Sequence, residues 1–344
     1  MQTARGVKGQ ILRGTEEGGK FYLFDEAHDQ ERVADLWFQE SHEGLILFVV
    51  FYTQACRWSQ CLACNLPSLC SKDHVDYKAI FEQIYQLFKR PDVKDKLSRI
   101  TKVIVSNNGS VLDQKTFSTM SLMYLLIKLN RHIPNMKVLS IETRPEYVEE
   151  VELEMLARAM AEGDQKPQLE LAVGMEAFDD HIRNDVFRKG LDLKKLETLI
   201  AMMDKHGFRL KVYLMQKPVP DMTNEAAIED LRLAIEYFGM LKERHPKVEI
   251  NLHINPTYVA RGTPLESAFK RGEYSPPLLT DVARAVLYSE DVPISVYIGI
   301  NDEGLAVPGG SFIREGDEKV LELLNRFNRL QQYDLLRRAA QMAS

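Results

Sequence analysis

From about residue 44 onward, apolar residues along this chain follow two patterns that alternate. Short runs rich in β-branched residues are followed by longer stretches with apolar positions three and four residues apart. The first pattern is typical of strands and the second of amphipathic helices. The predicted strands are 45–51, 102–106, 137–142, 169–174, 209–214, 248–254 and 294–299. The predicted helices are 74–90, one that ends near 131, one that begins near 145, 178–186, 192–206, 224–244 and 315–340.

Strands that alternate with helices form a parallel sheet with right-handed crossovers. Six or seven consecutive units favour an α/β fold that is a partial or nearly closed (β/α)6–7 TIM-like barrel. We expect an N-terminal extension packed on the barrel at 1–43, a core barrel at 44–290, and a C-terminal strand and helix at 291–344 that complete it. Within the extension, 20–24 is predicted to be a strand and 28–40 a helix.

The composition is that of a soluble globular protein, because 45% of the 344 residues are hydrophobic and 27% are charged. The N-terminus has no apolar region typical of a signal peptide, and no stretch is apolar enough to cross a membrane, so we expect a cytoplasmic protein without a membrane partner. The net charge is −6 and the basic residues are dispersed. A protein that grips nucleic acid usually has a basic face, so the sequence does not indicate a strong tRNA-binding surface.

All four cysteines lie within residues 51–70, FYTQACRWSQCLACNLPSLC. Cys56, Cys61 and Cys64 follow the first predicted strand with the spacing C-x4-C-x2-C. Cysteines this close together seldom reach disulfide geometry, whereas thiolates suit zinc or an iron–sulfur cluster. A structural zinc site needs four ligands, and Cys70 is the candidate for the fourth. A cluster with three cysteine ligands would instead keep one iron open, and the residues alone leave both interpretations standing.

This cysteine loop resembles that of the radical S-adenosylmethionine (SAM) enzymes, as a variant of their usual C-x3-C-x2-C spacing. The stretch TQACRWSQCLAC is similar to the branch that contains the catalytic subunit of Elongator and the radical SAM subunit of archaeosine synthase. The resemblance implies that Cys56, Cys61 and Cys64 bind a [4Fe–4S] cluster whose open iron binds SAM. It also implies that one-electron reduction cleaves SAM to methionine and a 5′-deoxyadenosyl radical, which abstracts hydrogen from the substrate.

Other segments that resemble this branch follow later strands, in order, from about 44 to 280. In such barrels the chemistry collects on the loops after the strands. The resemblance implies that NNGSVLD, ETRP, VGME and NPT line the SAM site, although each alone would also fit an ordinary turn or helix cap. Gln216 joins them because it follows the predicted strand at 209–214, where either Gln216 or Lys217 could face the ligand. The candidate SAM contacts are therefore Asn108, Gly109, Ser110, Glu142, Arg144, Glu176, Gln216 and Asn255.

The resemblance points to nucleobase or tRNA modification, such as the 7-deazaguanine chemistry of archaeosine formation. The acidic net charge favours a nucleoside-type or other small substrate over tRNA. One alternative is a tRNA-modifying radical SAM enzyme that acts in a complex, and another is a non-enzymatic zinc-binding interaction protein. The resemblance also implies an electron donor such as flavodoxin or ferredoxin. Cys70, the remaining thiol, is a candidate catalytic hydrogen donor; burial in the core is the alternative interpretation.

Overall fold

The computed structural model describes residues 4–163 and 165–342. This part of the chain divides into two compact units. The first unit contains 4–15, Leu23–Ser59 and Leu66–Val173, and the second contains Glu16–Tyr22, Gln60–Asn65 and the chain from Gly174 onward. Each unit is an α/β structure with strands that are mainly parallel, which confirms the predicted fold class. None of the described helices is both long enough and apolar enough to span a membrane.

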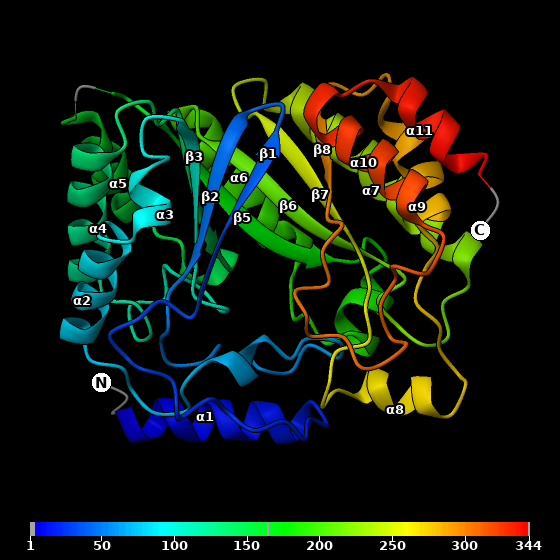
Figure 1. Ribbon diagram of the computed structural model, residues 1–344, viewed down its shortest axis with the longest axis horizontal. Coiled ribbons are helices and arrows are strands. Elements are labelled where there is room, and N and C mark those ends of the chain that lie inside the picture. The colour runs from blue at the N-terminus through cyan, green and yellow to red at the C-terminus, as the bar shows by residue number, and fades with distance from the viewer. Residues whose placement is uncertain (1–3, 164, 343–344) are drawn as a thin grey trace. The chain divides into compact units, whose positions relative to one another are not determined.

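The sheet of the first unit has the order β1-β2-β3-β4-β5 (Figure 1). Its first strand pairs antiparallel with the second, and the following pairs are parallel. The strands are β1 (Asp35–Ser41), β2 (Gly44–Val50), β3 (Ile100–Ser106), β4 (Val138–Thr143) and β5 (Gln168–Glu176), the last of which continues into the second unit. Because β2, β3 and β4 run parallel, their carboxyl ends lie at the same edge of the sheet. Parallel strands are joined by crossover connections, which are usually helical.

Two helices of the first unit, α2 and α4, begin at residues whose side chains cap free backbone N–H groups. Asp76 accepts from the N–H of Lys78 at 2.9 Å at the start of α2, and Ser118 accepts from the N–H of Ser121 at 3.1 Å at the start of α4. The α-helices are α1 (Ala4–Glu17), which ends in the second unit, α2 (Tyr77–Leu87), α3 (Pro91–Lys94), α4 (Thr119–His132) and α5 (Glu150–Ala161). Short 3-10 turns occupy Leu66–Leu69 and Pro145–Tyr147.

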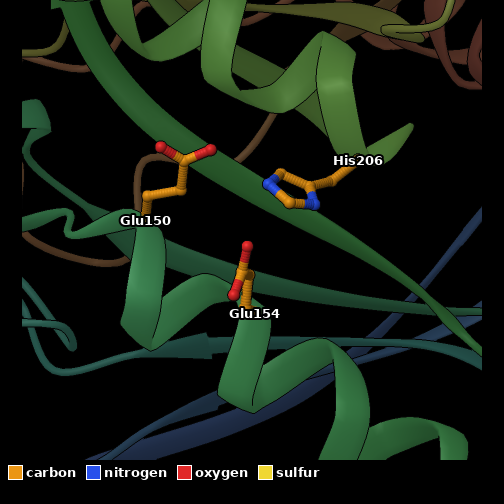
Figure 2. Close-up of side chains that lie close together, drawn as sticks. All are labelled: Glu150, Glu154 and His206. Atoms are coloured by element: carbon orange, nitrogen blue, oxygen red, sulfur yellow. The ribbon is translucent and has the colours of Figure 1, made fainter.

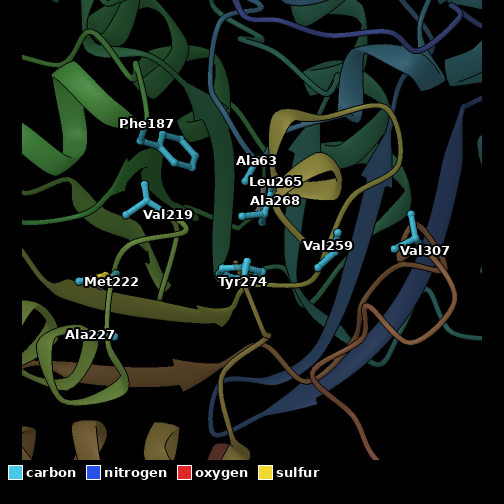
Figure 3. Packing of buried hydrophobic residues seen from close by; sticks show 10 residues of the cluster. All are labelled: Ala63, Phe187, Val219, Met222, Ala227, Val259, Leu265, Ala268, Tyr274 and Val307. Atoms are coloured by element: carbon cyan, nitrogen blue, oxygen red, sulfur yellow. The ribbon is translucent and has the colours of Figure 1, made fainter. Parts of the chain in front are cut away.

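The sheet of the second unit pairs β6 (Arg209–Gln216), β7 (Ile250–Pro256) and β8 (Ser295–Ile298) in parallel. Its α-helices are α6 (Leu193–His206), α7 (Asn224–Arg244), α8 (Pro264–Lys270), α9 (Leu279–Val286), α10 (Glu318–Leu330) and α11 (Tyr333–Ala340). A π-helix covers His181–Val186 and a 3-10 turn Leu287–Ser289. Ten buried residues, from Ala63 to Val307, form a hydrophobic cluster in this unit (Figure 3). Phe187 and Tyr274 are its largest members.

Three predictions about local structure were wrong. The predicted helix at 28–40 is instead a loop followed by β1, because Trp37 stacks on Phe48 of β2 at 4.1 Å between ring centroids. Residues 20–24 form no strand in the described chain. The predicted helix at 315–340 is two helices, separated at Gln331, whose φ of 52° is incompatible with helix continuation. Helices α1, α8 and α9 were not predicted.

Candidate functional site

The cysteine loop leaves the carboxyl end of β2, as the sequence predicted. In the first unit, the Ser59 hydroxyl donates a hydrogen bond to the Cys56 carbonyl. In the second unit, the Cys64 N–H donates to the Cys61 carbonyl at 3.1 Å, and the Lys20 ammonium donates to the Cys64 carbonyl. None of the three loop cysteines forms a disulfide, and all three have intermediate exposure. Their convergence on one cluster stays a prediction.

The turn after β3 lies directly against Cys56 in the first unit. A β-carbon at Gly109 would come 3.2 Å from the Cys56 Cα and 3.4 Å from its Cβ, so a side chain there would press on the Cys56 backbone. Asn108 is left-handed, with φ 54°, and its side-chain nitrogen is buried without a hydrogen-bond partner among the described residues. A close backbone approach beside an unpaired buried amide fits a polar ligand such as the amino-acid end of SAM.

Hydrogen bonds join the turn after β3 to the end of β4. The Ser110 and Thr143 hydroxyls are 2.7 Å apart, and the Arg144 N–H donates to the Ser110 hydroxyl at 3.1 Å. The Val111 N–H donates to the Glu142 carbonyl at 2.9 Å. The first unit therefore brings together the candidate residues Ser110, Glu142 and Arg144 at neighbouring strand ends.

A buried ion pair lies next to Cys56. The Arg57 guanidinium forms a two-pronged contact with Asp113, with 2.8 Å between Nη2 and Oδ1, and its side chain is only 11% exposed. The same guanidinium lies 4.7 Å from the ring centroid of Tyr147. Burial opposes the charge on Arg57, but the hydrogen bond and charge of Asp113, with Tyr147 and Cys56 nearby, raise its pKa. Burial, reinforced by the Asp113 charge, raises the pKa of Tyr147 to about 12.

A second cation–π contact connects the residues that follow Cys56 to the loop after β4. The Arg144 guanidinium lies 4.9 Å from the ring centroid of Trp58, and it also pairs with Glu146. Sequence reasoning selected Arg144 but missed Arg57 and Trp58. The sequence signal that could have found them is their position between Cys56 and Cys61. A large aromatic residue such as Trp58 is not needed in an exposed loop, so its presence there indicates packing.

In the second unit, Glu176 is held at the end of β5. Lys189 contacts its carboxylate at 2.7 Å, and a β-carbon at Gly174 would overlap both of these side chains. Glu176 has a φ of 72°, a strained value for a residue with a side chain. The following loop is anchored by Asp230, which accepts from the N–H of Phe178 at 2.9 Å. Burial raises the pKa of Asp230, although its backbone hydrogen bonds oppose this.

Gln216 ends β6, and Asn255 is the penultimate residue of the neighbouring strand β7. Gln216 is completely buried, and neither its side-chain oxygen nor its nitrogen has a hydrogen-bond partner among the described residues. The Asn255 amide fits only because Gly299 has no side chain, since a β-carbon there would overlap its oxygen. An unpaired buried amide costs about 1–3 kcal/mol, so a polar ligand at Gln216 would offset this cost.

Cys70 is completely buried in a hydrophobic cluster with Val7, Ile11 and Ala55. Its sulfur lies 3.8 Å from the Asn107 carbonyl oxygen and 3.7 Å from that of Leu66. These surroundings agree with the interpretation of Cys70 as a packed core thiol; its catalytic role stays a prediction.

Two glutamates lie on α5, the helix that follows the loop after β4. Glu150 and Glu154 lie one helical turn apart and project from the same side of the helix (Figure 2). His206, also drawn there, ends α6 in the second unit. Carboxylates four residues apart are common on partly solvated helix faces, and these two are not included in the candidate site.

We expect Gly109→Ala to disturb the site locally. The added methyl group would press on the Cys56 backbone, with an expected loss of stability of about 1–3 kcal/mol and weaker iron binding. Gly9→Ala on α1 is the matched control, because its β-carbon would meet only the Arg13 side chain at 3.5 Å. Urea unfolding and iron analysis of both variants check this. Equal behaviour of the two would contradict the close packing of Gly109 on Cys56.

No protein-family model matches the chain. An uncharacterized protein of Methanocaldococcus jannaschii is 23% identical over 262 residues, which cover 74% of this chain and 68% of that protein. Archaeosine synthase subunit beta of Methanosarcina acetivorans is 28% identical over 239 residues, which cover 69% of this chain. The match spans 64% of that relative's length. This similarity confirms the resemblance to archaeosine synthase noted from the sequence motifs.

Among solved structures, the chain resembles Methanocaldococcus infernus Elp3, with a TM-score of 0.44 and 18% identity over 65% of this chain and 51% of that one. It also resembles the radical S-adenosylmethionine methyltransferase TsrM of Kitasatospora setae, solved with tryptophan and aza-SAM bound. That likeness has a TM-score of 0.42 and 15% identity, over 67% of this chain and 39% of that one. Another TsrM structure holds cobalamin and a [4Fe-4S] cluster.

Proposed function

We propose that this chain is a radical SAM enzyme that acts on a nucleoside-type or other small substrate. The observation that carries the proposal is the contact between Cys56, on the loop after β2, and the Gly109 turn, on the loop after β3. The first cysteine of the motif and the turn that resembles the SAM-binding segment therefore pack together, although they lie 53 residues apart (109 − 56) in the sequence.

The residues of the chain fit the two cofactors. Cys56, Cys61 and Cys64 would hold the [4Fe–4S] cluster, since none of them forms a disulfide and cysteine thiolates are its usual ligands. When bound with SAM, the cluster supplies the one-electron reduction that cleaves SAM and starts hydrogen abstraction from the substrate. The protein positions the cofactors and excludes water.

The candidate SAM contacts divide by the chemistry they offer. The backbone turn at Asn108 and Gly109 and the Ser110 hydroxyl offer groups for the amino-acid end of SAM. Carboxylates such as Glu176 offer acceptors for ribose hydroxyls, and the unpaired Gln216 amide offers both a donor and an acceptor. The other proposed contacts are Glu142, Arg144 and Asn255.

Anaerobic reconstitution with iron and sulfide tests this function. We expect a brown protein with about four irons per chain that converts SAM to 5′-deoxyadenosine when a strong reductant is added. A colourless protein that retains one zinc would overturn the proposal in favour of a zinc-binding interaction protein.

Substrate class is tested with the same reconstituted protein. Nucleosides and tRNA, each carrying deuterium in the base, are supplied separately, and deuterium transfer to 5′-deoxyadenosine is measured by mass spectrometry. The dispersed basic residues and the net charge of −6 favour transfer from the small nucleosides. The name of the Methanosarcina relative favours a tRNA nucleoside as the second candidate. Transfer only from tRNA, and loss of that transfer at high salt, would support this second candidate.

A further inference from the structure

Two crossed cation–π contacts connect the Cys56 segment to the loop after β4 in the first unit. Arg57 lies over the ring of Tyr147, at 4.7 Å, and Arg144 lies over the ring of Trp58, at 4.9 Å. Each segment thus supplies one guanidinium and one aromatic ring. A single contact of this kind contributes about 0.5–2 kcal/mol, depending on how well it is shielded from water. Two contacts in opposite directions fix both the separation and the rotation of the segments.

The Arg57 charge is also fixed in place. Asp113, on the turn after β3, holds the guanidinium with two hydrogen bonds, and the Asp113 side chain is only 5% exposed. A planar guanidinium held by two prongs cannot rotate freely, so its charge stays beside its chain neighbour, Cys56. Water screens such a buried pair only weakly.

We propose that the crossed contacts clamp the Cys56 segment onto the loop that begins at Arg144, and that the Arg57–Asp113 pair sets the reduction potential of a cluster bound at Cys56. This inference rests on the proposed function for its second half only. Arg57, Trp58 and Tyr147 act as positioning residues, because their contacts hold the segment that carries Cys56 against the loop after β4.

Because Arg57 and Asp113 carry opposite charges, removing each charge is expected to shift the reduction potential of the cluster in the opposite direction. Reduction adds an electron to the cluster, and a nearby positive charge stabilises the reduced form. Arg57→Gln is therefore expected to make the potential more negative, and Asp113→Asn to make it more positive. Damage to the fold would move both variants in the same direction, so the opposite signs separate tuning from disruption.

The first experiment is a redox titration of reconstituted holoprotein, followed by the electron paramagnetic resonance signal of the reduced cluster. The matched control is Arg90→Gln, which breaks another two-pronged Arg–Asp contact, to Asp92, with both side chains 45% exposed. We expect an unchanged potential in this control. Shifts of equal sign in Arg57→Gln and Asp113→Asn, or no shift in either, would overturn the tuning.

The second experiment needs no cofactor. Trp58 and Trp37 are the two tryptophans, so Trp37→Phe leaves Trp58 as the single indole emitter. In that background, Arg144→Gln is expected to shift Trp58 emission to longer wavelength and to increase its quenching by acrylamide, whereas Arg90→Gln changes neither. Identical emission and quenching in all three proteins would overturn the clamp. If the wild-type protein binds no iron, the proposed function fails, while this fluorescence test of the clamp remains valid.

Discussion

Replacing Cys56, Cys61 or Cys64 with alanine is expected to lower the iron content of the reconstituted protein severalfold and to reduce SAM cleavage to background. The reason is that a cluster with three cysteine ligands has no spare protein ligand, so each loss leaves a second iron without one. Iron analysis, the absorbance of the brown chromophore and production of 5′-deoxyadenosine measure the effect.

Cys70→Ala provides the control for this series. Cys70 is completely buried among apolar residues, so its replacement should cost a modest amount of stability and leave the iron content unchanged. Loss of metal in Cys70→Ala, together with one zinc per wild-type chain, would indicate a four-cysteine zinc site instead. The series therefore discriminates between the two interpretations that the cysteine spacing left open.

Lys102→Met is expected to destabilise the protein by about 3–5 kcal/mol. The Lys102 side chain is completely buried on β3, and its ammonium lies 2.7 Å from the Glu43 carboxylate and 2.8 Å from that of Glu170. The Glu170 side chain is also completely buried. Without this ammonium, negative charge would remain in a region with little water, where an uncompensated ion is costly. Urea unfolding at neutral pH measures the difference.

Lys8→Met is the matched control, because it removes the same group from an exposed pair with Asp73, at 2.6 Å. These side chains are 35% and 53% exposed, so the expected loss is below about 1 kcal/mol. The double variant Lys102→Met with Glu170→Gln should recover part of the stability by removing one buried charge. Equal losses in Lys102→Met and Lys8→Met would refute the idea that the buried ion pair maintains the first unit.

Local periodicity predicted most elements of the fold, because a strand or helix buries one face in a pattern that the sequence repeats. It failed at β1, where the spacing of Val33, Leu36 and Trp37 also fits a helix. Pairing with β2 and the stacking of Trp37 on Phe48 decide for a strand there. Such contacts depend on a neighbouring segment of the chain, and the periodicity of one segment carries no information about its neighbour.

The sequence by itself determined the order of most strands and helices from β2 onward, the cysteine spacing and the candidate groups at the strand ends, because each depends on residues close together in the chain. Only the tertiary structure decided that Gly109 packs on Cys56, that Arg57 pairs with Asp113, and that Lys102 is buried with Glu170. These partners are 53, 56 and 68 residues apart in the sequence (109 − 56, 113 − 57 and 170 − 102). Burial and pairing over such separations depend on how the strands align, and that alignment fixes which charges lose water and which gain a partner.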